Sequence, residues 1–236
     1  MGTDPGSPVK ADGPVRALRA ALRRARAYRW LRRLGGRLTA PFRVLRVHLL
    51  YSKDLTPPIH PFRARVPIRV VTADPGEIEE VARINRGATQ DLAAIYRERI
   101  GNGALCFVAL VDGTIIGYNW IATRSLVDVD GKVIRLGGGD VFCLDAFTSE
   151  PSRGNAIHTE LLSRMLEWAR AQGYRTAYTE VSAVLRRSWK THHRLDWELT
   201  GKLLHLRSIL GLRPRLWRMS GSAYPIAGVE PGHRGW

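Results

Sequence analysis

The feature that most constrains this fold is a junction between an apolar run and a long amphipathic stretch, within residues 141–172. The run 141–148 (VFCLDAFT) has the composition of a buried strand, and residues 154–172 repeat apolar side chains at helical spacing before Gly173. One apolar face of that helix is formed by Ile157, Leu161, Leu162 and Met165. The junction therefore predicts a strand that leads through a short turn into a helix.

The turn at this junction can hold phosphate groups. Residues 147–158 read FTSEPSRGNAIH. The first N–H groups of a helix have no partner within the helix and point the same way, and the helix dipole adds positive potential. Such a turn binds a pyrophosphate well. The same residues also suit an ordinary loop with a surface arginine, Arg153, and the turn alone favours neither interpretation.

Regular elements continue from Val66 along the chain. Asp74, Pro75 and Glu77 come close to a capping box at the start of a helix, and the Asp112-Gly113 and Asp130-Gly131 dipeptides indicate hairpins. Further strands are predicted at 66–72, 104–111, 114–123, 176–182 and 201–210, and further helices at 89–100 and 184–195. Strands alternate with helices, which predicts an α/β domain.

Two short motifs resemble those of the GNAT superfamily of acetyltransferases. Residues 153–158 (RGNAIH) are similar to its acyl-CoA pyrophosphate motif, Gln/Arg-x-x-Gly-x-Gly/Ala, with Ala156 and His158 at the two small-residue positions. Ala156 fits this position if its φ is negative. Residues 188–197 (SWKTHHRLDW) resemble the closing pattern Ser/Ala-x-x-x-Tyr-x-x-x-Gly-Phe, with His192 at the tyrosine position. The order of elements from Val66 to Leu210 also resembles that superfamily.

The resemblance implies an α/β (α+β) fold with a GNAT-type mixed central sheet flanked by helices. It implies an N-acetyltransferase or N-acyltransferase that moves an acyl group from acetyl-CoA, or another acyl-CoA, to an amine by direct attack. The neighbouring strand would diverge and leave room for the pantetheine arm. The residues that would bind the acyl-CoA are Phe147, Thr148, Arg153, Gly154, Asn155, Ala156, Ile157, His158 and Ser188.

Three residues are candidates for proton transfer. Asp140, thirteen residues before Arg153, resembles the general base of the histone-acetyltransferase branch, but it can equally close the glycine turn 137–139. Glu180 is a second candidate base or a surface carboxylate. His192 would protonate the leaving thiolate or lie solvated beside His193. Adjacent helical histidines point about 100° apart, and the chain has no HExxH or paired cysteines, so we expect no metal site.

The net charge of +16 is concentrated near the N-terminus. Twelve Arg and Lys side chains and no carboxylate lie between Gly13 and Lys53. We therefore divide the chain into a disordered leader (1–13), a basic segment (14–62), an acyltransferase domain (66–212) and a tail (213–236). The basic segment comprises an Arg-rich amphipathic helix, an extra strand at 43–51 and a proline-rich connector.

The Arg-rich helix, residues 14–37, leaves several partners open. It can dock on the domain, lie on an anionic membrane surface or bind an acidic partner, with nucleic acid favoured less. Cys106 and Cys143 lack the spacing of a metal or redox motif and predict free thiols, so we expect a cytoplasmic protein, peripheral to the membrane if that helix binds lipid. Two other functions remain open: a catalytically degenerate acyl-CoA or partner-binding module, and a nucleic-acid-binding protein.

Overall fold

The structure is a computed structural model that describes residues 45–85, 91–127, 131–206, 215–221 and 224–229. The predicted leader, 1–13, and the predicted Arg-rich helix lie outside the described residues, so the predictions about its partners stay predictions. Within the described ranges, no helix has both the length and the apolar character needed to cross a membrane.

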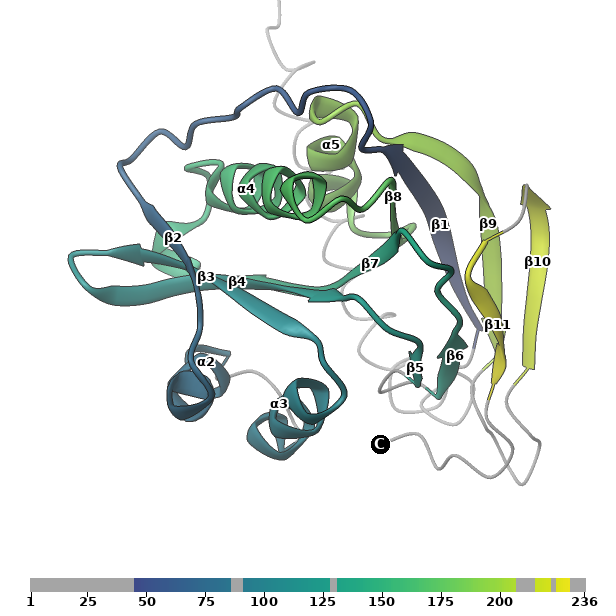
Figure 1. The fold of residues 1–236 in the computed structure, drawn as a ribbon, viewed down its shortest axis with the longest axis horizontal. Coiled ribbons are helices and arrows are strands. Elements are labelled where there is room, and N and C mark those ends of the chain that lie inside the picture. The colour runs from purple at the N-terminus through teal and green to yellow at the C-terminus, as the bar shows by residue number, and fades with distance from the viewer. Residues whose placement is uncertain (1–44, 86–90, 128–130, 207–214, 222–223, 230–236) are drawn as a thin grey trace, which may run out of the picture. The chain divides into compact units, whose positions relative to one another are not determined.

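The core of the fold is an eight-stranded sheet with the strand order β10-β9-β1-β8-β7-β4-β3-β2 (Figure 1). Neighbouring strands are antiparallel except for the parallel pair β7–β8, which confirms the predicted mixed sheet. The strands are β1 (Leu45–Asp54), β2 (Arg69–Thr72), β3 (Leu105–Val111), β4 (Thr114–Ala122), β7 (Asp140–Thr148), β8 (Thr176–Ser182), β9 (Glu198–Leu206) and β10 (Arg215–Gly221).

Helices cover both faces of this sheet. Helices α2 (Ile78–Ile84) and α3 (Leu92–Gly101) lie on one face, and α4 (Ile157–Ala171) and α5 (Arg186–Arg194) lie on the other (Figure 1). The 3-10 turn Pro75–Glu77 precedes α2, and the Glu77 carboxylate accepts the Asp74 N–H at 2.8 Å, as the predicted capping box requires. The part of the sheet around β3 and β4 is therefore covered by helices on both faces.

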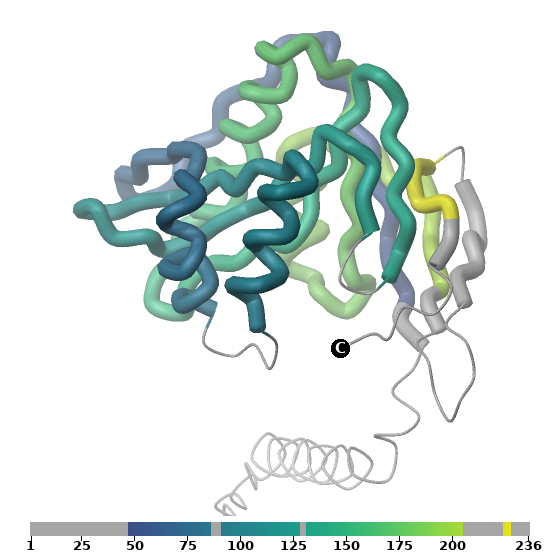
Figure 2. Tube along the Cα trace, turned by 60° about the horizontal axis from the view of Figure 1, so that its bottom comes forward, coloured from purple at the N-terminus to yellow at the C-terminus, as the bar shows by residue number. Residues whose placement is uncertain are grey.

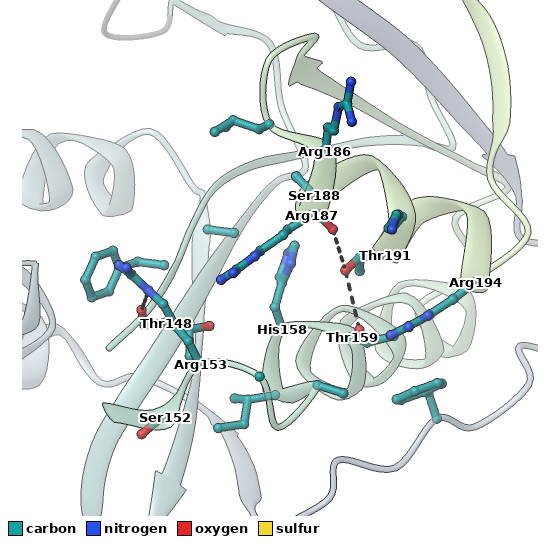
Figure 3. Close-up of a pocket in the computed structure, with 18 of the residues that line it drawn as sticks. Thr148, Ser152, Arg153, His158, Thr159, Arg186, Arg187, Ser188, Thr191 and Arg194 are labelled. Atoms are coloured by element: carbon teal, nitrogen blue, oxygen red, sulfur yellow. Dashed lines mark hydrogen bonds between the residues drawn. The ribbon is translucent and has the colours of Figure 1, made fainter. Parts of the chain in front are cut away.

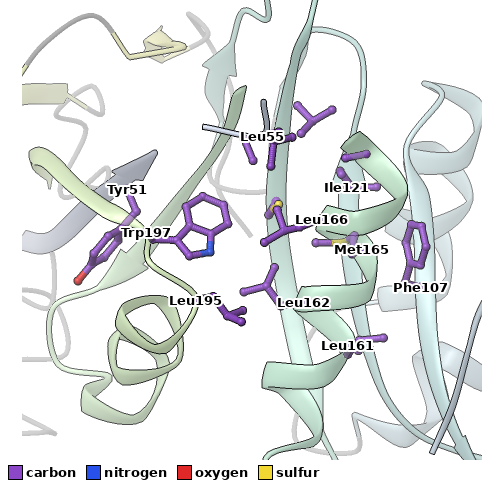
Figure 4. Close-up of a cluster of buried hydrophobic side chains, with 14 of the residues drawn as sticks. Tyr51, Leu55, Phe107, Ile121, Leu161, Leu162, Met165, Leu166, Leu195 and Trp197 are labelled. Atoms are coloured by element: carbon purple, nitrogen blue, oxygen red, sulfur yellow. The ribbon is translucent and has the colours of Figure 1, made fainter. Parts of the chain in front are cut away.

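The apolar face of α4 anchors the helix on the sheet (Figure 4). Its side chains pack against Leu55, which directly follows β1, and Trp197, which directly precedes β9. Full burial of one such aliphatic side chain stabilises a fold by roughly 1.5–3 kcal/mol. The buried residues on this face are Ile157, Leu161, Leu162, Met165, Leu166 and Ala169. This packing holds the N-terminal end of α4 in a fixed position beside the end of β7.

A second, three-stranded sheet lies beside β1 and β9 (Figures 1 and 2). It consists of β5 (Leu126–Val127), β6 (Lys132–Ile134) and β11 (Ile226–Val229). The β5–β6 pair confirms the second predicted hairpin, whose turn residues 128–130 lie outside the described residues.

Several elements differ from the expectations drawn from the sequence. The extra strand predicted at 43–51 is β1, and it pairs with both β8 and β9 in the middle of the main sheet. The segment 213–236, predicted as a tail, contains β10 and β11. β1 and β10 are thus strands of the same sheet as the predicted domain, 66–212. Helix α4 begins at Ile157 rather than at residue 154 because the residues before it form a tight turn.

Candidate functional site

A gap opens between the parallel strands β7 and β8. The two strands pair only from Asp140↔Thr176 to Cys143↔Thr179. β7 then continues to Thr148 and β8 to Ser182 without further pairing between them. Because β7 still pairs with β4 as far as Thr148, the other backbone edge of β7 at residues 144–148 faces the gap.

A β-bulge in β7 lies where the gap begins. Tyr118 pairs with Phe147, and Trp120 pairs with Leu144. Between these two pairs β7 therefore contains one residue more than β4. Asp145 takes up the extra length with φ 46°, in the left-handed region that a non-glycine residue adopts at a cost. β-bulges commonly reorient strand edges next to functional sites, and this one accompanies the divergence of β7 from β8.

The buried side chain of Arg99 holds this bulge in place. Its Nη1 donates to Asp145 Oδ2 at 2.6 Å, and its guanidinium carbon lies 5.3 Å from the Tyr96 ring centroid and 5.4 Å from that of Trp120. The charge-assisted bond is stronger than a neutral one, and the aromatic rings stabilise the cation. Helix α3, which carries Arg99, thus positions the bulge.

The turn between β7 and α4 has two residues in the left-handed conformation. Gly154 has φ 90°, and Ala156 has φ 60° and ψ 22°. The condition under which alanine would fit this position without strain, a negative φ, is not met: Ala156 occupies a conformation that costs a residue with a Cβ roughly 1–2 kcal/mol. Among the residues that the structure describes, none of the N–H groups of 154–158 donates to a protein acceptor. These amides are available to bind an anion.

The connector before β2 holds this turn from the outside. The backbone carbonyl of Asn155 accepts the Arg65 N–H at 2.9 Å, and the side-chain Nδ2 of Asn155 donates to Ser152 O at 3.3 Å. The buried Glu160 carboxylate accepts the Ala64 N–H at 2.7 Å. Asn155 therefore supports the turn, whereas the other residues predicted to bind acyl-CoA line the adjacent cleft.

This cleft has a volume of about 1110 Å³ and lies between the end of β7, the start of α4 and helix α5 (Figure 3). The structure brings together eight of the nine predicted cofactor-binding residues there. They are Phe147, Thr148, Arg153, Gly154, Ala156, Ile157, His158 and Ser188.

Positive charge dominates the cleft. Its lining contains seven cationic side chains and no carboxylate. The cations are Arg63, Arg65, Arg153, Arg186, Arg187, Lys190 and Arg194. Of these seven residues, only Arg153 was predicted from the sequence. Helix α5 has a basic residue at every fourth position: Arg186, Lys190 and Arg194. This periodicity places them on one helix face and would have predicted the basic side of the cleft.

Arg153 is anchored at the rim of the cleft. Its Nε donates to Thr148 O at 3.0 Å, its Nη1 lies 3.1 Å from Glu150 Oε1, and its guanidinium carbon lies 5.7 Å from the Phe147 ring centroid. Arg187 extends toward the same opening from α5 (Figure 3). Cations from two different elements thus flank the free amides of the turn.

Two imidazoles lie behind this opening, and only one of them lines it. His158 faces the cleft, whereas His192 is buried in α5, where its Nδ1 donates to Ser188 O at 2.9 Å. His192 stacks on Tyr51 with 5.3 Å between ring centroids, and its centroid lies 6.3 Å from that of His158. Burial lowers the pKa of each histidine to about 4, so both are neutral at pH 7.

The two candidate bases lie at different places along the sheet. The Asp140 carboxylate accepts the Gly137 N–H at 3.2 Å and closes the glycine turn. Asp140 begins β7, roughly 26 Å along an extended strand from Thr148, and it does not line the cleft. Glu180 does not line the cleft either, but it is the first β8 residue beyond the last pair with β7, so it flanks the start of the gap.

Only one of the two carboxylate oxygens of Glu180, Oε1, contacts polar groups among the described residues. Oε1 contacts the Lys132 ammonium and lies 3.7 Å from His48 Nδ1. Oε2 is buried and has no hydrogen-bond partner among the described residues. A buried carboxylate oxygen without a partner is costly, and an amine that reached it could donate a hydrogen bond there. In the described part of the chain no three His, Cys, Asp or Glu side chains form a group that could hold a metal ion.

Comparisons with known proteins agree with this arrangement. The model of the acetyltransferase (GNAT) family matches residues 77–197, which is more than half of the 236 residues. A GCN5-related N-acetyltransferase from Sphaerobacter thermophilus superposes with a TM-score of 0.50 at 16% identity. That match covers 80% of this chain but only 57% of the Sphaerobacter chain.

Two other solved structures match the chain at low identity. An N-acetyltransferase from Staphylococcus aureus Mu50 has a TM-score of 0.49 at 16% identity, over 64% of this chain and 95% of that one. A predicted acetyltransferase with acetyl-CoA from Clostridium acetobutylicum has a TM-score of 0.43 at 17% identity, over 56% of this chain and 90% of that one. No curated protein matches the chain.

Proposed function

The chain belongs to the acetyltransferase (GNAT) family, and from this premise we propose that it transfers an acyl group from acyl-coenzyme A to an amine. The observation that carries the proposal is the gap between β7 and β8, which begins after Cys143 and Thr179. An unpaired strand edge offers backbone N–H and C=O groups in a row, and the pantetheine arm of coenzyme A carries amides that can pair with them. The thioester would then lie at the inner end of the gap, beside the β7 bulge.

The free amides and the basic cleft support the donor part of this proposal. At neutral pH the diphosphate and the 3′-phosphate of coenzyme A together carry about four negative charges. The amides of 154–158 would hold the diphosphate at the positive end of α4. Of the seven cations, Arg63 and Arg153 contact Glu160 and Glu150, and five have no ion pair among the described residues. That number is close to the charge that has to be neutralised.

We assign the base role in this reaction to Glu180. Of the two candidate carboxylates it is the one that flanks the gap, and its Oε2 has no hydrogen-bond partner among the described residues. Glu180 would take a proton from the ammonium of the acceptor, and the neutral amine would attack the thioester carbonyl. Asp140 closes the glycine turn in this scheme, and His192, whose ring is hydrogen-bonded to Ser188 O and stacked on Tyr51, is given no catalytic role.

Purified protein tests the proposal in two steps. Native mass spectrometry with added acetyl-CoA measures binding of the donor, and release of free thiol in the presence of a panel of primary amines measures transfer. Both signals are expected, and transfer should fall at least tenfold in Glu180→Gln. Failure of acetyl-CoA and of longer acyl-CoA species to bind would refute the proposal.

A second function, binding of acyl-CoA without catalysis, is favoured by the Lys132–Glu180 contact. A lysine ammonium already lies on the candidate base, so an acceptor amine has to compete with it. Donor binding without thiol release across the amine panel would establish this second function in place of the first.

A further inference from the structure

A buried lysine lies at the inner end of the gap, on the sheet face opposite α4. Along β8, Ala177 and Val181 pack in the cluster around α4, whereas Tyr178 packs in the cluster around α2 and α3. Because strand side chains alternate, Glu180 lies on the same face as Tyr178. On that face the Lys132 ammonium contacts Glu180 Oε1, and the side chain of Lys132 is only 2% exposed.

The position of this pair in the sheet places a primary amine near the proposed reaction centre. Glu180 directly follows Thr179, the last β8 residue that pairs with β7. Of the four described lysines, which are Lys53, Lys132, Lys190 and Lys202, only Lys132 contacts Glu180. If the proposed function is right, a thioester bound in the gap meets this amine before any acceptor enters.

We propose that Lys132 is a self-acylation site, a proposal that rests on the proposed function. Glu180 takes one proton from the Lys132 ammonium, and the neutral amine forms an N–C bond with the acyl carbon of acyl-CoA. The C–S bond then breaks, and the thiolate leaves with its electron pair and takes the second proton from the nitrogen. The products are acyl-Lys132 and free coenzyme A, and the proton on Glu180 passes to solvent.

Acylation would change the role of Glu180. An amide carries no positive charge, so acyl-Lys132 no longer forms an ion pair with the carboxylate. An external amine then no longer competes with the Lys132 ammonium for Glu180. Acyl-Lys132 is therefore the form of the protein that accepts an external amine at this carboxylate.

The burial of Lys132 makes the test selective. The full chain is incubated with acetyl-CoA at neutral pH without an acceptor, and acetylation is mapped by peptide mass spectrometry. Lys132 is expected to acetylate at least tenfold faster than Lys202, which is exposed on β9. Acetic anhydride, which reacts from bulk solvent, should reverse this order. The rate at Lys132 should not depend on protein concentration, because the donor and the acceptor are in one molecule.

Two variants separate this reaction from nonspecific chemistry. Arg153→Glu, which weakens donor binding, should slow acetylation of Lys132 by acetyl-CoA at least tenfold and leave the anhydride pattern unchanged. Lys132→Arg keeps the charge but offers no nucleophile, because a guanidinium stays protonated, and the modified peptide should disappear. If either variant fails to fold, the ratio of Lys132 to Lys202 labelling in the wild-type protein still decides the question.

The outcomes distinguish this proposal from the proposed function. Acetyl-CoA binding and thiol release with amines, without modification of Lys132, would overturn self-acylation alone. Loss of donor binding altogether would overturn both. Modification of Lys202 and Lys190 ahead of Lys132 would mean that acetyl-CoA reacts only with exposed amines, and would also overturn self-acylation.

Discussion

At the scale of single residues, Ala156 shows how the phosphate-binding turn tolerates a missing glycine. Its φ of 60° is the conformation that glycine adopts freely, so the backbone has kept the geometry of the turn while the side chain has changed. Ala156, which carries this strain, is the N-cap of α4 and so sets the orientation of the first free N–H groups of the helix. Such strain persists only where the surrounding structure fixes the backbone, and here the bonds of Asn155 and Glu160 fix it.

Ala156→Gly is therefore expected to stabilise the protein. Removal of the Cβ relieves roughly 1–2 kcal/mol of backbone strain, and the greater freedom of glycine in the unfolded chain offsets about 0.4–1 kcal/mol of that. The free energy of unfolding, measured with urea, should rise by up to about 1.6 kcal/mol. The matched control Ala171→Gly, in the last turn of α4, should lower it instead. Equal losses in both variants would contradict the strain at Ala156.

Arg153→Glu should weaken acyl-CoA binding at least tenfold. The substitution places a negative charge beside the free amides of the turn and next to Glu150, where two carboxylates then repel each other and the donor phosphates. Isothermal titration with coenzyme A measures the affinity, and Arg170→Glu, on an exposed residue of the same helix, is the control. Unchanged affinity would mean that this turn does not bind the diphosphate.

The low pKa values of His158 and His192 predict a loss of stability in mild acid. Their pKa is about 4 in the folded protein and about 6.5 in a free side chain. Between these values the unfolded chain binds more protons, so stability is full above pH 6.5 and falls as the pH drops toward 4. The upper limit is on the order of 3 kcal/mol per histidine. His192→Gln should flatten the profile measured by thermal unfolding, whereas His193→Gln, on an exposed residue, should leave its slope unchanged.

At the scale of elements, local patterns predicted most of the strands and helices between Val66 and Leu206. The Asp112-Gly113 hairpin, the strand at 141–148 and the helix after the turn are confirmed, because each depends on residues close together in the sequence. The gap was expected only from the family resemblance, since strand divergence depends on pairing between β7 and β8. The bulge at Asp145 could not be predicted, because Arg99 holds it from 46 residues away.

The basic face of α5 should contribute to the affinity for coenzyme A. Lys190 and Arg194 lie one turn apart, and both line the cleft. The double variant Lys190→Glu/Arg194→Glu should weaken coenzyme A binding at least tenfold and make the remaining binding less sensitive to salt, because fewer charge contacts are left. The control Arg170→Glu/Lys202→Glu makes the same change in net charge at residues outside the cleft. Equal weakening in both would assign the effect to overall charge rather than to α5.

At the scale of the whole molecule, β1 joins the two halves of the main sheet. It pairs with β8 on one side and with β9 on the other, and its Leu50 and Tyr51 are buried. Local patterns identified this strand at 43–51 but could not give its place in the sheet, since its partners lie more than 120 residues away. The domain predicted from the sequence begins at Val66 and lacks β1, so in isolation it would expose the strand edges of β8 and β9 that pair with β1.

Truncation tests this role of β1. A chain that begins at Val44 keeps every described strand and should bind acyl-CoA with unchanged affinity. A chain that begins at Leu55 lacks β1, so the facing edges of β8 and β9 lose their backbone partners and the core loses Leu50 and Tyr51. Unpaired buried backbone groups and lost apolar burial each cost several kcal/mol, comparable to the whole stability of a domain. This shorter chain should show no cooperative unfolding by circular dichroism and no donor binding. Leu50→Asp in the full chain should cause the same loss without changing its length, and full donor binding by either protein would contradict a structural role for β1.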